Sequence, residues 1–130
     1  MANLLDACRR DLIEVAKPLL QEEGVDVEAR DENKMTALHA ACVNGNVELA
    51  LALVDRGADV DARDVAQMTP LHYACINGHM ELAMALVDRG ADVDARNVDQ
   101  RTPLHDARIM VTWSWPWLFW IGVPMLMLEV

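Results

Sequence analysis

Residues 69–96 read TPLHYACINGHMELAMALVDRGADVDAR, and residues 36–63 read TALHAACVNGNVELALALVDRGADVDAR, which is nearly the same sequence. The two copies begin 33 residues apart, and a third start, TPLHDAR, follows after the same interval at residues 102–108. A divergent copy of the closing segment, QEEGVDVEAR, stands in the same phase at residues 21–30. Self-similarity at a fixed period of this length indicates a repeat protein, in which each unit packs on its neighbours.

Each copy carries the signals of a helix pair. The threonine that opens a copy can cap a helix, because its oxygen accepts hydrogen bonds from free backbone N–H groups. The proline that follows it in two copies fits the first helical turn. Gly45 and Gly78 end this inner helix, and an outer helix is predicted over about 47–55 and 80–88. The acidic ADVDAR segments then form hairpin-like connections.

The chain resembles the ankyrin repeat family, whose period is 33 residues and whose signature is T-P-L-H-x-A with two helices per unit. The resemblance covers residues 4–108 and implies an all-α repeat solenoid of helix-turn-helix units with hairpin-like connections. The predicted organisation is a repeat domain over 1–108, made of an N-terminal capping repeat, two full repeats and an incomplete third (1–35, 36–68, 69–101 and 102–108), followed by an apolar, tryptophan-rich tail (109–130).

Charge and cysteine content limit the function classes. The net charge is −10, and only one acid, Glu129, lies beyond residue 108. Such an acidic domain should repel phosphate backbones, so nucleic-acid binding is not expected. The three cysteines are an odd number without a CxxC pair, and the N-terminus has no uninterrupted apolar segment. These features predict buried, free thiols and a cytoplasmic location.

The histidines recur at the repeat period, which is typical of a structural residue. We expect His39, His72 and His105 to be buried and bonded to the neighbouring threonine or to backbone. Each of the first two opens an H-x-x-C pair, but equivalent positions on packed helices lie about 8–10 Å apart. A zinc site needs four ligands within about 2.0–2.3 Å of the ion. The sequence therefore predicts no metal, no cofactor and no catalytic constellation.

The resemblance also implies where a protein partner would bind. Ankyrin partners usually contact the hairpin tips and the exposed side of the inner helices, which form a concave surface. In this chain those positions are Glu32, Asn33, Met35, Val43, Asn44, Val65, Ala66, Met68, Tyr73, Ile76, Asn77, Val98, Asp99 and Arg101. They differ between copies while the framework stays constant, and several in the centre are apolar. The resemblance thus favours a non-catalytic adaptor or scaffold that binds another protein, although isolated apolar surface residues are common in any protein.

One position departs from the family pattern at each hairpin. Lys34, Gln67 and Gln100 stand where ankyrin repeats commonly have glycine. If the backbone keeps a positive φ there, each of these side chains carries an energetic cost.

The tail raises an alternative function. Residues 109–128 carry no charge, and as a helix they would measure about 30 Å, close to the thickness of a bilayer core. Three interpretations stay open: a membrane anchor that tethers the repeats, a cap packed on the open flank of the solenoid, or an end never selected for a role. The residues expected to contact a membrane or the flank are Trp113, Trp115, Trp117, Leu118, Phe119 and Trp120.

Overall fold

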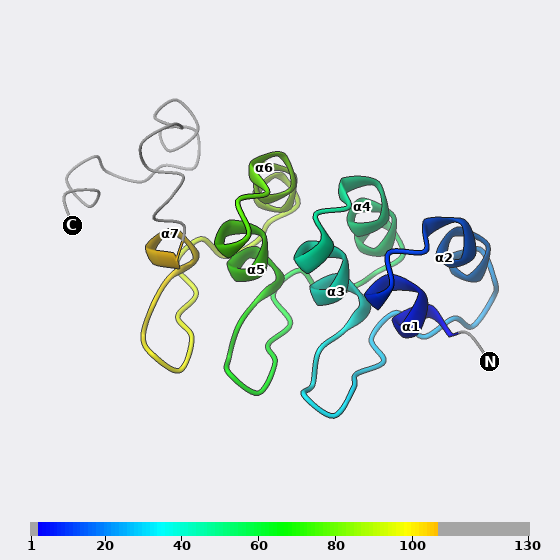
Figure 1. The fold of residues 1–130 in the computed structure, drawn as a ribbon, viewed down its shortest axis with the longest axis horizontal. Helices are drawn as coiled ribbons and strands as arrows, with labels where there is room; N and C mark the ends of the chain where they lie inside the picture. The colour runs from blue at the N-terminus through cyan, green and yellow to red at the C-terminus, as the bar shows by residue number, and fades with distance from the viewer. Residues whose placement is uncertain (1–2, 107–130) are drawn as a thin grey trace.

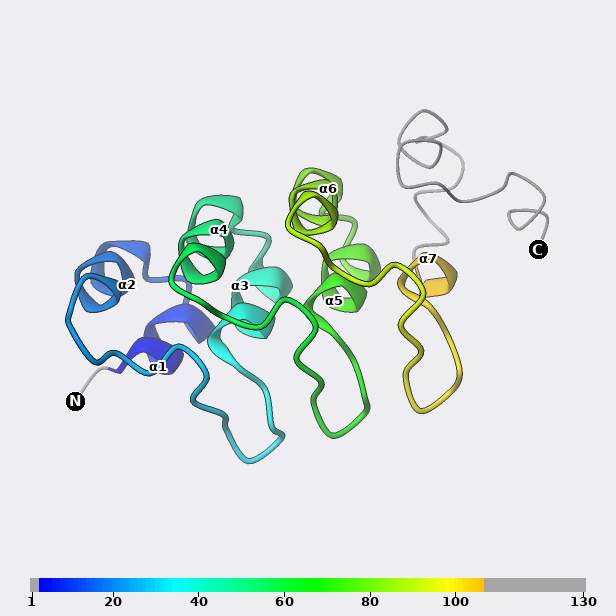
Figure 2. The ribbon, with the colours of Figure 1, turned by 180° about the vertical axis from the view of Figure 1, so that it is seen from behind.

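The computed structural model describes residues 3–106, which form seven helices and no strand. The helices stand in two rows (Figure 1), and the view from behind shows the same arrangement (Figure 2). Each inner helix packs on the inner helices before and after it, and the outer helices do the same. The inner row is α1 (Leu4–Arg9), α3 (Ala37–Asn44), α5 (Pro70–Ile76) and α7 (Pro103–Asp106), and the outer row is α2 (Ile13–Leu20), α4 (Val47–Asp55) and α6 (Met80–Asp88). The predicted all-α repeat solenoid is confirmed.

The inner helices begin at the predicted threonines. The Thr36 hydroxyl accepts from the N–H of His39, and the His39 ring nitrogen Nδ1 accepts from the N–H of Thr36 at 3.1 Å. Thr69 and His72 form the same reciprocal cap. These bonds satisfy backbone donors that a helix N-terminus otherwise leaves free. At the other end of α3, Gly45 adopts a left-handed φ of 74°, and the chain turns into the outer helix.

Leucines on both rows form the centre of the core. Alanines fill much of the remaining interior, and their small side chains allow the helices to approach closely. Helices of seven to nine residues are marginal alone in water, so this packing between units supplies their stability. Among the largest fully buried side chains are five leucines: Leu38, Leu49, Leu53, Leu82 and Leu86.

Three long loops project from the same side of the inner row (Figure 1). Their tips, residues 31–35, 64–68 and 97–101, are here called the first, second and third finger loops. Each loop is closed by a backbone hydrogen bond from its first to its last residue, 3.0–3.1 Å long. The side chain of the first residue also accepts two N–H groups of its own loop. The predicted hairpin-like connections are therefore tight turns held by their own Asp or Asn.

The fourth residue of each finger loop has a left-handed backbone. Lys34, Gln67 and Gln100 have φ values of 62°, 60° and 62°. Side chains are disfavoured in this region because Cβ approaches the carbonyl oxygen, at a cost of roughly 1–2 kcal/mol. These positions keep the geometry that glycine favours, and the energetic cost expected from the sequence applies to them.

Neighbouring finger loops are joined to one another. The N–H of Val65 donates to the carbonyl of Asn33 at 3.0 Å, and the bond from Val98 to Ala66 repeats it in the next pair. The second and third fingers also receive a bond from a histidine of the inner helix before them: His39 Nε2 lies 2.9 Å from the Met68 carbonyl, and His72 Nε2 lies 2.9 Å from the Arg101 carbonyl. The fingers therefore have fixed positions relative to the helices and to each other.

Arginine side chains add a second link between the fingers. Arg30 Nη1 donates to the carbonyl of Arg63 at 2.7 Å, and Arg63 Nη1 donates to the carbonyl of Arg96 at the same distance. Each of these guanidinium groups also bonds within its own unit. The arginine that ends each ADVDAR segment thus has a structural reason to be constant.

The N-terminal unit has a proline inside its second helix. Helix α2 includes Pro18 and runs on to Leu20. Between residues 3 and 106, no helix has both the length and the apolar character needed to cross a bilayer. The tail (109–130), with Trp113, Trp120 and its other predicted contact residues, lies outside the described residues.

Candidate protein-binding face

The finger loops and the exposed side of α3 and α5 form one surface, here called the finger face. It carries four of the six large apolar side chains that are exposed between residues 3 and 106. On the helices these are Val43, 39% exposed, and Ile76, 43% exposed; on the fingers they are Val65, 55% exposed, and Val98, 57% exposed. Ile76 follows Val43 by one repeat period, as Val98 follows Val65, so the apolar residues form two rows across the repeats.

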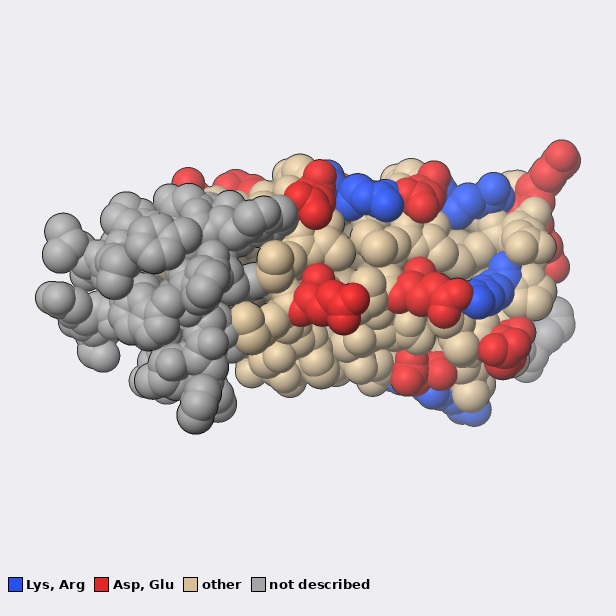
Figure 3. Space-filling view, turned by 90° about the horizontal axis from the view of Figure 1, so that it is seen from above, with Lys and Arg blue, Asp and Glu red and all other residues tan. Residues whose placement is uncertain are grey.

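The opposite side, formed by the outer helices, has a different character. Acidic side chains gather over it, with lysines and arginines among them (Figure 3). Lys17 pairs with Glu48 of the next outer helix, and Arg89 pairs with Asp55. Such exposed pairs contribute little to stability, but they keep this side solvated. The outer side therefore carries paired charges, while four of the six exposed large apolar side chains lie on the finger face.

The predicted contact residues fall into three groups by exposure. Nine are exposed: Glu32, Asn33, Val43, Asn44, Val65, Ile76, Asn77, Val98 and Asp99. Four are partly buried: Met35, Ala66, Tyr73 and Arg101. Met68 alone is buried. Asn44 and Asn77 also serve the framework, because their amide groups donate to backbone carbonyls at 2.9 Å.

The expectation that Met68 belongs to an exposed apolar patch is wrong. Its side chain is only 9% exposed, and its sulfur lies 3.2 Å from the amide nitrogen of Asn97 in the third finger loop. The next finger therefore covers it. Its backbone is also fully engaged, since its N–H bonds to Asp64 and its carbonyl to His39. Met68 therefore lies between neighbouring fingers and is not part of the exposed surface.

Tyr73 is anchored between α5 and the second finger loop. Its hydroxyl donates a hydrogen bond to Oδ2 of the buried Asp64. Its ring meets His39 edge-on, with the ring centroids 5.7 Å apart and the planes at 81°. Burial, and then the bond to Asp64, raise the pKa of Tyr73 above its ordinary value. The tyrosine therefore offers a fixed, partly covered ring to the finger face.

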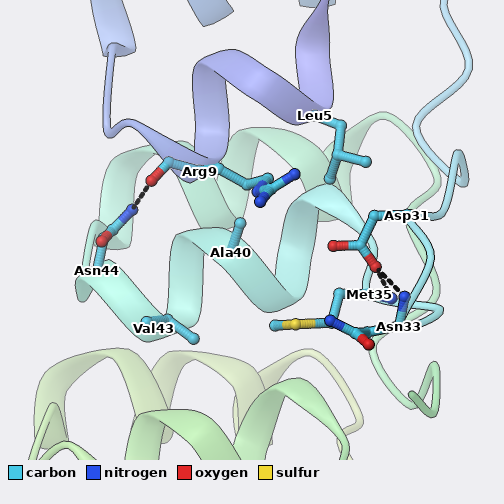
Figure 4. Close-up of a pocket in the computed structure, with 8 residues that line it drawn as sticks. All are labelled: Leu5, Arg9, Asp31, Asn33, Met35, Ala40, Val43 and Asn44. Atoms are coloured by element: carbon cyan, nitrogen blue, oxygen red, sulfur yellow. Dashed lines mark hydrogen bonds between the residues drawn. The ribbon is translucent and has the colours of Figure 1, made fainter. Parts of the chain in front are cut away.

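In the first repeat the corresponding place is hollow. A pocket of about 220 Å³ opens between α1, α3 and the first finger loop. Arg9 and Asp31 point toward one another across the space beside Ala40 (Figure 4). The lining residues are Leu5, Arg9, Asp31, Asn33, Met35, Ala40, Val43 and Asn44.

Four residues of this lining, Asn33, Met35, Val43 and Asn44, were predicted as contact residues, and the structure brings them together. Three others, Leu5, Arg9 and Asp31, have no signal that singles them out in one copy of the repeat. The signal that could have found the hollow is the exchange of Tyr73 for Ala40 at equivalent positions.

The buried histidines and cysteines belong to the framework of the repeats. His39 is buried, and its Nδ1 lies 3.0 Å from the Thr36 hydroxyl, as predicted. Burial lowers its pKa, because the charged ring would be desolvated. All three cysteines are buried, and burial raises the pKa of the Cys8 thiol to about 12. In the described part of the chain, no three metal-binding side chains lie close enough to hold an ion.

Comparison with known protein families agrees with this architecture. The family model described as ankyrin repeats (many copies) matches residues 4–54, 38–85 and 71–107. These overlapping matches extend over most of the chain and over every helix of the structure. Ankyrin repeats generally mediate protein–protein interaction and are typically not catalytic. On its repeats, its fold and these matches, the chain belongs to the ankyrin repeat family.

Proposed function

We propose that this protein is a non-catalytic adaptor that binds another protein through its finger face. One observation carries the proposal: four of the six large apolar side chains that are exposed between residues 3 and 106 lie on this face. Single exposed apolar residues are normal, whereas a concentration of them on one face supports an interaction surface. The pairs Val65–Val98 and Val43–Ile76 stand at equivalent positions of neighbouring repeats.

The framework explains how this face can bind. The finger loops are fixed by their own turns and by bonds to neighbouring fingers, so little conformational entropy is lost when a partner binds. The valines and Ile76 supply apolar anchors. Glu32, Asp99 and Arg101 surround them with charge, which favours a partner of matching polarity and orients it.

The test replaces the two exposed fingertip valines. A partner is isolated with the full chain, and its dissociation constant is then measured for Val65→Glu combined with Val98→Glu. Because both side chains would bring an uncompensated charge to the contact, we expect affinity to fall roughly a hundredfold, in line with the loss of two apolar anchors.

A matched pair of apolar residues provides the control. Leu12 and Val15 are 41% and 38% exposed on the N-terminal unit, away from the finger loops. Replacing both by glutamate should leave affinity unchanged. Equal loss with this pair, or none with the fingertip pair, would contradict the proposed face. Circular dichroism of each variant verifies that the helices are retained.

A second candidate function is membrane tethering through the tail. Its support is the sequence alone, the uncharged segment 109–128 with a length that matches a bilayer core. Liposome flotation of the full chain beside a version ending at Arg108 tests it. If the segment inserts, only the full chain floats and alkaline carbonate does not remove it. Flotation of neither version would eliminate this candidate.

A further inference from the structure

The first two repeats place different side chains in the same space. Ala40 lies nine residues after Asp31, as Tyr73 lies nine residues after Asp64. In the second repeat the phenol of Tyr73 fills the angle between inner helix and finger loop and bonds to Asp64. In the first repeat only the methyl group of Ala40 stands there, and the hollow of about 220 Å³ remains.

Asp31 keeps the bonding position that Asp64 uses for its tyrosine. Its Oδ1 accepts the N–H groups of Asn33 and Met35, at 2.8 and 3.0 Å. Its second oxygen points away from the finger backbone, into the hollow (Figure 4). Within residues 3–106 no group donates to that oxygen. A partly buried carboxylate oxygen of this kind favours a hydroxyl or N–H donor from outside the chain.

The walls of the hollow suit an aromatic ring. Leu5 lines the hollow from α1, which is the inner helix before α3. In the next unit the inner helix before α5 is α3, and its His39 meets the ring of Tyr73. Met35 and Val43 add apolar surface, and sulfur packs favourably at ring edges. The Arg9 guanidinium reaches over the space and can stack on a ring face. The volume is below the roughly 300–1,000 Å³ of pockets for drug-sized ligands, and it fits one side chain.

We propose that this hollow is a recognition pocket for a tyrosine side chain of the protein partner, whose hydroxyl donates to the free oxygen of Asp31. The proposal rests on the adaptor function proposed above and adds a specificity to it. The molecule supplies its own precedent, since Tyr73 and Asp64 form this pair one repeat further along. A phosphorylated tyrosine would bring a second negative group against Asp31, so the pocket selects the unmodified phenol.

Three single-residue probes test the chemistry. N-acetyl-tyrosinamide, its phenylalanine counterpart and its phosphotyrosine counterpart are titrated separately into the full chain, and the methyl NMR signals of Leu5, Met35 and Val43 are followed. We expect saturable shifts with the tyrosine probe. The phenylalanine probe lacks the donor and should bind roughly tenfold more weakly. Absence of shifts, equal binding of the phenylalanine probe, or tighter binding of the phosphorylated probe would overturn the proposal.

Two variants connect the shifts to this pocket, and the chain provides a model for each. Asp31→Asn keeps the turn, because Asn97 holds the third finger loop with the same two bonds, at 2.9 and 3.1 Å. It removes the second acceptor, so the tyrosine probe should lose roughly tenfold in affinity. Ala40→Tyr fills the hollow as Tyr73 does and should abolish the shifts. If Ala40→Tyr does not fold, Asp31→Asn still decides, since unchanged tyrosine binding there contradicts the assignment.

The fingertip variant separates this proposal from the adaptor function. Val65→Glu with Val98→Glu should weaken the partner but leave the tyrosine probe unaffected, because neither residue lines the pocket. If partner binding depends on the fingertips but Ala40→Tyr does not change it, the tyrosine pocket is wrong and the adaptor function stands. If the probe binds as expected but the fingertip pair has no effect on the partner, the proposed binding face is wrong.

Discussion

At the residue scale, side-chain carboxylates and amides determine the shape of the finger loops. Asp31, Asp64 and Asn97 occupy the same position, and each accepts the same two N–H groups through one oxygen. The second oxygen or nitrogen is then available for another role. In the second repeat that role is visible, because Asp64 holds the hydroxyl of Tyr73.

The Tyr73–Asp64 pair predicts a pH dependence. Burial and then Asp64 raise the pKa of Tyr73 in the folded state, so the unfolded chain loses this proton first, near its ordinary value of about 10. The stability linked to Tyr73 is therefore complete below that value and is lost as the pH rises through the folded pKa. Asp64→Asn retains the turn but removes the charge, and should lower the pKa of Tyr73.

Tyrosinate absorbance measures the pKa of Tyr73 directly, because Tyr73 is the only tyrosine in the chain. Ionisation of the native protein near the ordinary value, or no change with Asp64→Asn, would contradict the bond between the two side chains.

At the element scale, the helix boundaries follow from residues that are local in sequence. The outer helices, α4 (Val47–Asp55) and α6 (Met80–Asp88), coincide with the predicted ranges, because capping residues and glycines act on the nearest turn only. The burial of Met68 could not be predicted in this way. It depends on Asn97, which lies 29 residues further along and covers it only after the fingers have stacked.

Gly45 and Gly78 provide a matched test at this scale. Both have φ of 74°, so alanine at either site should cost about 1 kcal/mol of unfolding free energy. A Cβ on Gly45 would also come within 2.6 Å of the His79 ring, whereas a Cβ on Gly78 meets nothing within 4 Å. Gly45→Ala should therefore cost about 1 kcal/mol more than Gly78→Ala in urea denaturation.

His79→Ala provides the control for that difference. With the ring removed, the two glycine substitutions should cost the same. If the difference persists, the contact between α3 and the turn before α6 is not its cause.

At the scale of the whole molecule, stability comes from links between units. Arg63 bonds to Gln67 of its own unit and to the carbonyl of Arg96 in the next, at 3.2 and 2.7 Å. Arg96 bonds to Gln100 of its own unit at 3.1 Å, and the described residues contain no further finger for it to reach. The two arginines therefore have equal local roles and unequal roles in joining units.

This difference predicts unequal effects on folding. Arg63→Ala should lower the unfolding free energy by about 1 kcal/mol more than Arg96→Ala, because it also removes a hydrogen bond between repeats. It should also reduce the steepness of the urea transition, since repeats that are less coupled unfold less cooperatively. Equal effects of the two substitutions would show that the finger links do not couple the repeats.

The geometry of the candidate binding face was predictable only in part, for reasons of scale. Val65 and Val98 were foreseeable, because fingertip positions project from any repeat of this kind. The hollow at Ala40 was not foreseeable, because it is a space between two helices and a loop, and no single residue in the sequence indicates it.

The exchange between Ala40 and Tyr73 has a consequence for how such a protein evolves. A repeat that is duplicated whole inherits either an open site or a closed one, and substitution at that single position converts one into the other. The closed form adds the bond from Tyr73 to Asp64, whereas the bonds made by Arg30, His39 and Arg63 and those between the finger loops do not involve this side chain. Selection can therefore open or close this space at the cost of one side-chain bond, while the other links between the repeats are kept. Each duplicated unit can then be modified at this position independently of the rest of the scaffold.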